Sequence, residues 1–460
     1  MAGTPRAFAG VAAVAAALVP AAALAGAGSD GVGDPFFPQA GNRGYDVARY
    51  DISLRYRPSR DELSATTRIR ATAAEELSAF NLDFRGPRVR SIKVDGARAF
   101  GRREGQELIV TPKAEIGAGA RFGVAIRYGG EVGAVTDPDG SRAGWFNTDD
   151  GSLVAAEPVG SPTWYPVNDH PTDKARFAFE VQVPRGLEAI ANGRFTDRTR
   201  EGRWATFEWR QQEPMAPYLA TVATGQFRIE RSKVRGIPSL VALDPRVAAR
   251  SRKPLRRTGR IVALFESLFG PYPFGQIGAI VDDADFLGYA LETQTRPVYD
   301  RPPSSGLIAH ELAHQWFGNS VSLERWDEIW LNEGFATWAE WRWIEESGGP
   351  STARRFRELY ETPASREDFW NPPPASLPGP AKLFSTSVYV RGAMTLEVLR
   401  QQVGNSDFLE IMRRWAQENR NSNATIADFI ALSESVSADG GLSESVFGPW
   451  LYETGKPASP

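Results

Sequence analysis

The segment His310-Glu311-Leu312-Ala313-His314, together with Asn332-Glu333-Gly334 further along the chain, decides the fold predicted for this sequence. The chain has only three histidines in 460 residues, and two of them flank Glu311 at a spacing of four. On an α-helix this spacing places both imidazoles on one face, separated by about 6 Å of axial rise. Both rings can then reach one tetrahedral metal ion at about 2.0–2.1 Å.

Two carboxylates complete the pattern. Glu311 projects beside the imidazoles, where it can take a proton from a water molecule at the metal. Glu333 lies 19 positions after His314 and can supply a third ligand, which leaves the fourth position open for water or substrate. We therefore expect one zinc ion (Zn2+) per chain, bound by His310, His314 and Glu333.

The alternative interpretation of this segment is an ordinary amphipathic helix with two surface histidines. Ile308, Leu312, Trp316 and Phe317 make the segment largely apolar, so most of it should be buried. Buried imidazoles and carboxylates without a partner would each cost several kcal/mol, and a divalent cation removes that conflict. The surroundings therefore favour the metal site.

The composition sets limits on the class of protein. A length of 460 residues with 42% hydrophobic residues predicts about two or three globular domains. The net charge of -3 predicts no nucleic-acid binding. The sequence contains no cysteine, which excludes disulfides and thiolate ligands and leaves nitrogen and oxygen donors for a metal.

Residues 1–27 have the pattern of a signal peptide. Arg6 supplies the positive start, Phe8 to Val19 form an apolar core, and small-x-small cleavage sites follow within 23–27. The alternative is a retained membrane anchor, but the apolar run is short and interrupted. We expect secretion to the periplasm or the extracellular space by the general secretory route, with no stable membrane span after cleavage.

Two different periodicities divide the rest of the chain. Over residues 34–231, apolar and polar residues alternate in short runs such as Tyr50 to Tyr56, which predicts an N-terminal antiparallel β saddle or sandwich. Over residues 232–460 the apolar spacing becomes helical, beginning with Ile261 to Leu268. Within this second part, strands are expected at 277–281 and 286–291, and helices at 333–343, 388–403, 408–418 and 426–436.

The spacing HExxH-x18-E, followed by Gly334-Phe335-Ala336, resembles the gluzincin pattern of the M1 aminopeptidase family. Resemblances to other landmarks of the family are found at Trp164 to Asp169, Gly270 to Phe274 and Gly448 to Leu451. The resemblance therefore covers nearly the whole mature chain. It implies a β saddle domain followed by a thermolysin-like α/β, mainly helical catalytic domain. Larger members continue beyond this point, so we expect a short two-domain member of bacterial type with a more open cleft.

The resemblance also implies an activity, the hydrolysis of the N-terminal peptide bond of peptides through a zinc-activated water. Glu311 would be the general base, and Tyr389 would hydrogen-bond the oxyanion that forms from the carbonyl group. Glu292 and Glu157 would bind the free α-ammonium group of the substrate. The stretch around Ala290 would pair with the substrate backbone as an added strand.

The chain departs from the family pattern beside Glu292. Leu291 replaces the usual methionine and preserves apolar volume. Thr293 replaces the usual asparagine and removes an amide that could orient its neighbours. These departures bear on amine recognition and leave the metal chemistry untouched.

Two other functions fit parts of the sequence. One is a zinc endopeptidase, or a hydrolase of another small substrate, on the same scaffold. The other is a non-catalytic peptide-binding protein with a degenerate site, against which the intact set of metal ligands, general base and tyrosine argues.

Overall fold

The computed structural model describes residues 26–27, 31–437 and 440–458. The expected signal peptide at 1–27 therefore lies almost entirely outside the described residues. Across these three ranges, no helix has the length and apolar character needed to cross a membrane.

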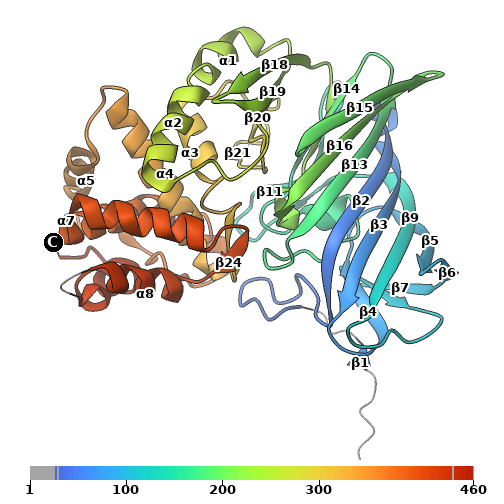
Figure 1. Cartoon of the computed structure of the whole chain (residues 1–460), viewed down its shortest axis with the longest axis horizontal. Coiled ribbons are helices and arrows are strands. Elements are labelled where there is room, and N and C mark those ends of the chain that lie inside the picture. The colour runs from blue at the N-terminus through green and yellow to red at the C-terminus, as the bar shows by residue number, and fades with distance from the viewer. Residues whose placement is uncertain (1–25, 28–30, 438–439, 459–460) are drawn as a thin grey trace, which may run out of the picture.

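The first part of the chain forms a β domain, which lies on the right in Figure 1. Its strands are Gly26–Ala27 (β1), Tyr45–Arg57 (β2), Glu62–Ala73 (β3), Leu77–Asp83 (β4), Arg88–Val94 (β5), Ala97–Arg98 (β6), Phe100–Glu104 (β7), Glu107–Thr111 (β8), Arg121–Glu131 (β9), Ala134–Thr136 (β10), Arg142–Asn147 (β11), Ser152–Ala155 (β12), Ala175–Pro184 (β13), Glu188–Ala191 (β14), Arg194–Glu201 (β15), Trp204–Met215 (β16) and Val222–Gly225 (β17). The largest sheet has eight strands in the order β15-β16-β13-β2-β3-β9-β5-β6. It is antiparallel except where β2 runs parallel to β13. A four-stranded sheet (β1-β4-β8-β7) and a five-stranded sheet (β10-β11-β12-β17-β14) complete the domain.

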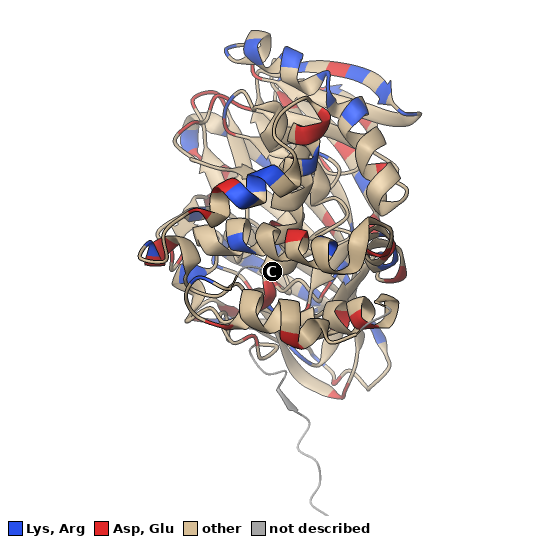
Figure 2. Ribbon diagram, turned by 90° about the vertical axis from the view of Figure 1, so that its left-hand side faces the viewer, with Lys and Arg blue, Asp and Glu red and all other residues tan. Residues whose placement is uncertain are grey.

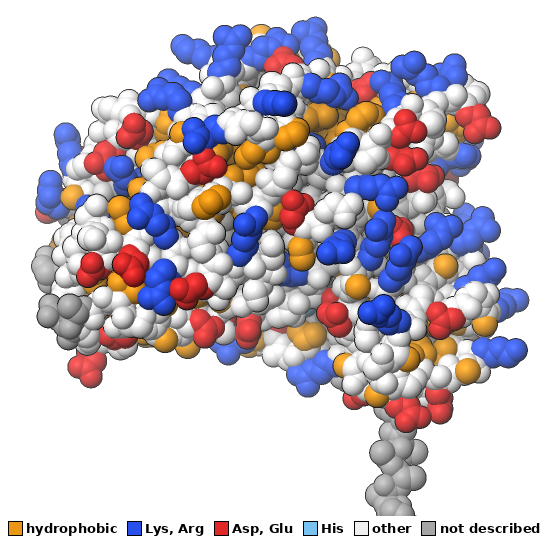
Figure 3. All heavy atoms as spheres, viewed as in Figure 1, with side chains coloured by type: hydrophobic (Ala, Val, Ile, Leu, Met, Phe, Trp, Pro, Cys, Tyr) orange, Lys and Arg blue, Asp and Glu red, His pale blue; other side chains and the backbone are white. Residues whose placement is uncertain are grey.

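The alternation of apolar and polar residues explains the two faces of the large sheet. In β2, Tyr50, Ile52 and Leu54 are buried, while Arg55, which follows Leu54, is exposed. A period of two sends successive side chains to opposite faces of a sheet. The structure thus confirms the predicted β domain. Figure 3 shows many Lys and Arg side chains spread over this part of the molecule.

The second part of the chain contains a small mixed sheet, a two-stranded sheet formed by its last two strands, and most of the helices. Its strands are Arg228–Val234 (β18), Ile237–Leu243 (β19), Ile277–Val281 (β20), Ala290–Leu291 (β21), Val298–Tyr299 (β22), Val321–Leu323 (β23) and Ser422–Ala424 (β24). Its helices are Ala248–Leu255 (α1), Thr258–Phe269 (α2), Ser305–Ala313 (α3), Trp330–Glu346 (α4), Thr352–Tyr360 (α5), Glu367–Trp370 (α6), Thr386–Glu418 (α7) and Ile426–Val436 (α8), followed by a π-helical segment at Ser443–Tyr452. The strand order in the mixed sheet is β18-β19-β20-β22-β21. The expected domain boundary at 231/232 falls inside β18.

The predicted helices are present, with differences in detail. The helices expected at 388–403 and 408–418 are the two arms of α7, which meet at Gly404, where φ is 79°. The helix expected at 426–436 is α8, and a capping box formed by Thr425 and Asp428 begins it. The strand expected at 286–291 is wrong over most of its length, because only Ala290–Leu291 pairs with another strand.

Polar contacts tie the two parts of the chain together. The Lys174 ammonium in the β domain donates to the carbonyl oxygens of Asn319 at 3.0 Å, Ser320 at 2.9 Å and Ser422 at 3.2 Å. Three acceptors use all three N–H groups of one ammonium. These bonds fix the β domain against the segment that follows α3, where the functional residues lie.

Candidate functional site

Helices α3 and α4 bring three potential metal ligands together. His310 lies in the last turn of α3, and His314 ends that helix with dihedral angles that are still helical. Glu333 lies in the first turn of α4. The Oε2 atom of Glu333 is 3.1 Å from His310 Nε2 and 3.5 Å from His314 Nε2. The three donor atoms lie within 4.8 Å of one another, so they can bind one ion.

Neighbouring groups orient both imidazoles. The Nδ1 atom of His314 is 3.1 Å from the carbonyl oxygen of Phe317, which can only accept. In neutral His314 the proton is therefore on Nδ1, which leaves the lone pair of Nε2 for a metal. The Nδ1 atom of His310 is 3.7 Å from Glu340 Oε2. Sequence reasoning missed Glu340, although its position two helical turns after Glu333 places both carboxylates on one face of α4.

The charges of these side chains show what kind of ion fits. Burial acts to raise the pKa of Glu333, but the two imidazoles outweigh it and lower the pKa to about 2. Burial acts to lower the pKa of His314, but Glu292 and Glu333 outweigh it and raise the pKa to about 10. Burial raises the pKa of Glu311 to about 8. Carboxylates that hold protons on buried imidazoles mark a place short of positive charge, and two nitrogens and one carboxylate are the donor set of a catalytic zinc site.

A close approach of two helices places Tyr389 beside the ligands. The Tyr389 ring lies 6.0 Å from the His310 ring, with 21° between the planes. A Cβ atom at Gly334 would meet the Trp330 ring at 2.5 Å, and one at Gly392 would meet the same ring at 2.4 Å. Only glycine therefore lets α4 and α7 approach this closely, and the approach brings Tyr389, about one turn before Gly392, to the ligand group.

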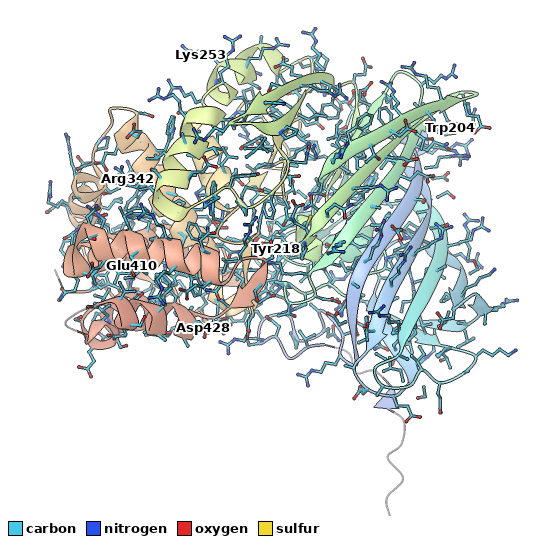
Figure 4. The ribbon with its side chains drawn as sticks, viewed as in Figure 1. Trp204, Tyr218, Lys253, Arg342, Glu410 and Asp428 are labelled. Atoms are coloured by element: carbon cyan, nitrogen blue, oxygen red, sulfur yellow. The ribbon has the colours of Figure 1, made fainter. Side chains whose placement is uncertain are left out.

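The Glu292 side chain is buried at the start of the loop that follows β21, near the metal ligands. Tyr218 donates from its hydroxyl to Glu292 Oε1 at 3.4 Å, and Figure 4 shows Tyr218 between the β domain and the helices. The carbonyl oxygen of Glu292 accepts hydrogen bonds from Gln315 Nε2 at 3.1 Å and Asn319 Nδ2 at 2.7 Å. Sequence reasoning missed these three residues, and the helical spacing of Gln315 and Asn319 after Glu311 was the available signal.

Glu157 comes from the β domain to the same place. Its Oε1 atom is buried and has no hydrogen-bond partner among the residues that the structure describes. Burial, together with the charges of Glu292 and Glu333, raises the pKa of Glu157 well above its ordinary value. Because Glu157 and Glu292 line one cavity and repel each other, a cation bound near both would be stabilised.

The two departures from the family pattern occupy ordinary structural positions. Leu291 is buried and pairs with Val298 across the β21–β22 ladder. Thr293 is buried, and its hydroxyl donates to the carbonyl oxygen of Arg296 at 2.5 Å. The amides that orient Glu292 therefore come from Gln315 and Asn319.

One cavity of about 540 Å³ collects every site residue expected from the sequence. These residues are Glu157, Ala290, Glu292, His310, Glu311, His314, Glu333 and Tyr389. The cavity can therefore present a bound peptide to a metal ion, a base, a hydroxyl donor and a pair of carboxylates at once.

Comparisons with known proteins agree with this arrangement. Residues 47–219 match the Peptidase M1 N-terminal domain, and residues 288–447 match the Peptidase family M1 domain. An M1 zinc metallopeptidase from Deinococcus radiodurans superposes with a TM-score of 0.86 at 28% sequence identity, over 94% of this chain and 98% of that one. The potential zinc ligands His310, His314 and Glu333 thus lie together in the fold of a zinc peptidase.

Curated relatives are longer than this chain. Probable aminopeptidase 2 of Sulfurisphaera tokodaii is 27% identical over 65% of this chain and 41% of its own length. Aminopeptidase M1 of Arabidopsis thaliana is 27% identical over 66% of this chain and 37% of its own length. The chain therefore spans about two fifths of the length of these relatives. The two family models, the fold and the ligand set show that the chain belongs to peptidase family M1.

Proposed function

We propose that this chain is a zinc aminopeptidase, which hydrolyses the N-terminal peptide bond of peptides. The observation that carries the proposal is a pair of carboxylates that shares one cavity with the expected zinc ligands, the buried Glu292 and the half-buried Glu157, whose Oε1 atom is buried. Two matched relatives are named aminopeptidases, and one solved variant of the Deinococcus enzyme holds a Tyr-Ser-Ala substrate.

The carboxylate pair selects a free amine. An α-ammonium group between Glu157 and Glu292 supplies the positive charge that these buried groups lack. The hydroxyl of Tyr218 and the amides that hold the Glu292 carbonyl fix the position of Glu292. Because the amine is anchored close to the metal ligands, the first peptide bond lies at the place of attack.

The backbone of the substrate has its own partner. Strand β21 lies at the end of its sheet, where Ala290 and Leu291 pair with β22 on one side only. Ala290 also lines the cavity. An extended peptide can therefore add to the free edge of β21 and hydrogen-bond its backbone there.

The chemical step uses two further side chains. A bound zinc ion would supply Lewis-acid chemistry, lowering the pKa of water and polarising the carbonyl group. Glu311 takes the proton of the attacking water and passes it to the departing amine. Tyr389 donates a hydrogen bond to the oxyanion that forms from the carbonyl oxygen.

The order of products tests the proposal against an endopeptidase. A peptide of about six residues should lose single residues from its N-terminus in sequence when product masses are followed over time. The amine anchor predicts this order, because each new N-terminus can bind between the same carboxylates. Internal fragments among the earliest products would instead identify an endopeptidase.

A further inference from the structure

The cavity has one cationic side chain that the proposed reaction does not use. Its lining includes six carboxylic acids, Asp139, Glu157, Glu292, Glu311, Glu333 and Glu340. Among the described residues that line it, Arg355 is the only arginine or lysine. A single guanidinium in an acidic cavity requires an explanation, because no role in amine binding or proton transfer falls to it.

Arg355 has no protein partner for its charge. Its Nε atom is buried, and within the described ranges the Arg355 side chain makes no hydrogen bond or ion pair, while its backbone N–H donates to the Ser351 carbonyl oxygen at 2.8 Å. Its guanidinium lies 6.0 Å from the centre of the Trp341 ring, which also lines the cavity. The preceding Arg354 differs, since it is exposed and its Nε donates to Glu358 at 2.7 Å.

Arg355 reaches the cavity from the side away from the β domain. It lies on α5, which Figure 1 shows at the far end of the helical part, and Figure 2 views the molecule from that side. Glu157 reaches the cavity from the β domain instead. The cavity therefore has a carboxylate pair for an amine on one side and a guanidinium on the other.

We propose that Arg355 binds the C-terminal carboxylate of short peptides whose N-terminal amine is held by Glu157 and Glu292. This inference rests on the proposed aminopeptidase function and narrows its preferred substrates to free peptides of about two to four residues. An extended tripeptide spans about 10 Å, and a cavity of about 540 Å³ lies within the usual range for small ligands.

The chemistry of the two groups supports this match. A guanidinium presents parallel N–H donors that fit a carboxylate in a bidentate manner. Leu307, Leu359, Phe384 and Val390 line the same cavity, and apolar walls strengthen an ion pair by lowering the local dielectric. The pair formed with a substrate would also satisfy the buried Nε atom.

Paired substrates test the inference on the zinc-loaded enzyme. We expect tri-alanine with a free C-terminus to be cleaved with a kcat/KM about tenfold or more above that of tri-alanine amide. In Arg355→Gln this preference should disappear through a higher KM for the free acid, with little change for the amide. In the matched control Arg354→Gln the preference should stay at the wild-type value.

The result has clear contrary outcomes. Equal kcat/KM for acid and amide in the wild type, or an equal loss for both in Arg355→Gln, would overturn the inference. A loss confined to peptides with an acidic side chain would also overturn it, because Arg355 would then read a side chain. An alanyl para-nitroanilide reporter distinguishes failure of the carboxylate proposal from failure of the aminopeptidase proposal. The reporter has no C-terminal carboxylate, so its hydrolysis tests the aminopeptidase function alone and shows that each variant is folded.

Discussion

Glu311→Gln should retain one zinc ion per chain and lose about a thousandfold or more of kcat. The substitution keeps the size and hydrogen-bonding shape of the side chain but removes its ability to accept a proton. Glu311 is buried beside both imidazoles and is not one of the three expected ligands. Metal analysis of the purified variant, with kcat measured on an alanyl reporter, checks both parts of this expectation.

A glutamate outside the cavity provides the control. Glu346 is exposed at the end of α4, and Glu346→Gln should leave kcat and zinc content at their wild-type values. If Glu311→Gln kept most of the activity, another group would have to be the general base. If it lost the zinc as well, the loss of activity would not report on proton transfer.

Removal of the zinc should abolish activity and destabilise the fold. Glu157, Glu292 and Glu333 line one cavity, and a cation offsets the repulsion that Glu292 and Glu333 exert on Glu157. At a free zinc concentration a thousandfold above Kd, binding adds about 4 kcal/mol to the free energy of unfolding. Dialysis against a chelator, followed by thermal unfolding and by activity after stoichiometric zinc is returned, measures both effects.

His314→Ala distinguishes loss of the site from side effects of the chelator. This variant should bind no zinc at stoichiometric concentration, and added zinc should neither raise its Tm nor restore activity. Unchanged activity in the zinc-free wild type would show that the reaction does not need the metal, and full zinc binding by the variant would show that the metal centre is elsewhere.

The parts of the site that the sequence predicts best are those within one element. His310 and His314 meet because a helix repeats every 3.6 residues, and that geometry needs no knowledge of the rest of the fold. Tyr389 is different, because its place depends on two helices crossing at Gly334 and Gly392. From the sequence alone, Tyr389 could be predicted as a site residue only through the resemblance to a family.

Local sequence patterns failed at positions whose structure depends on tertiary contacts. The apolar run at 286–291 predicts a strand, yet Phe286 is exposed and Gly288 has φ of 87°, which interrupts an extended backbone. Arg355 lines the cavity and Tyr218 contacts Glu292 there, but both lie on elements outside the metal motif, with no local spacing that connects them to it.

The central claim is that Glu157 and Glu292 anchor a free N-terminal amine beside the zinc ligands. The most direct measurement compares kcat/KM for one peptide with a free N-terminus and for the same peptide after N-acetylation. Acetylation removes the positive charge, and leaving the two carboxylates without their cation costs enough free energy to lower kcat/KM about a hundredfold or more. Cleavage of the acetylated peptide at the rate of the free one would contradict the account.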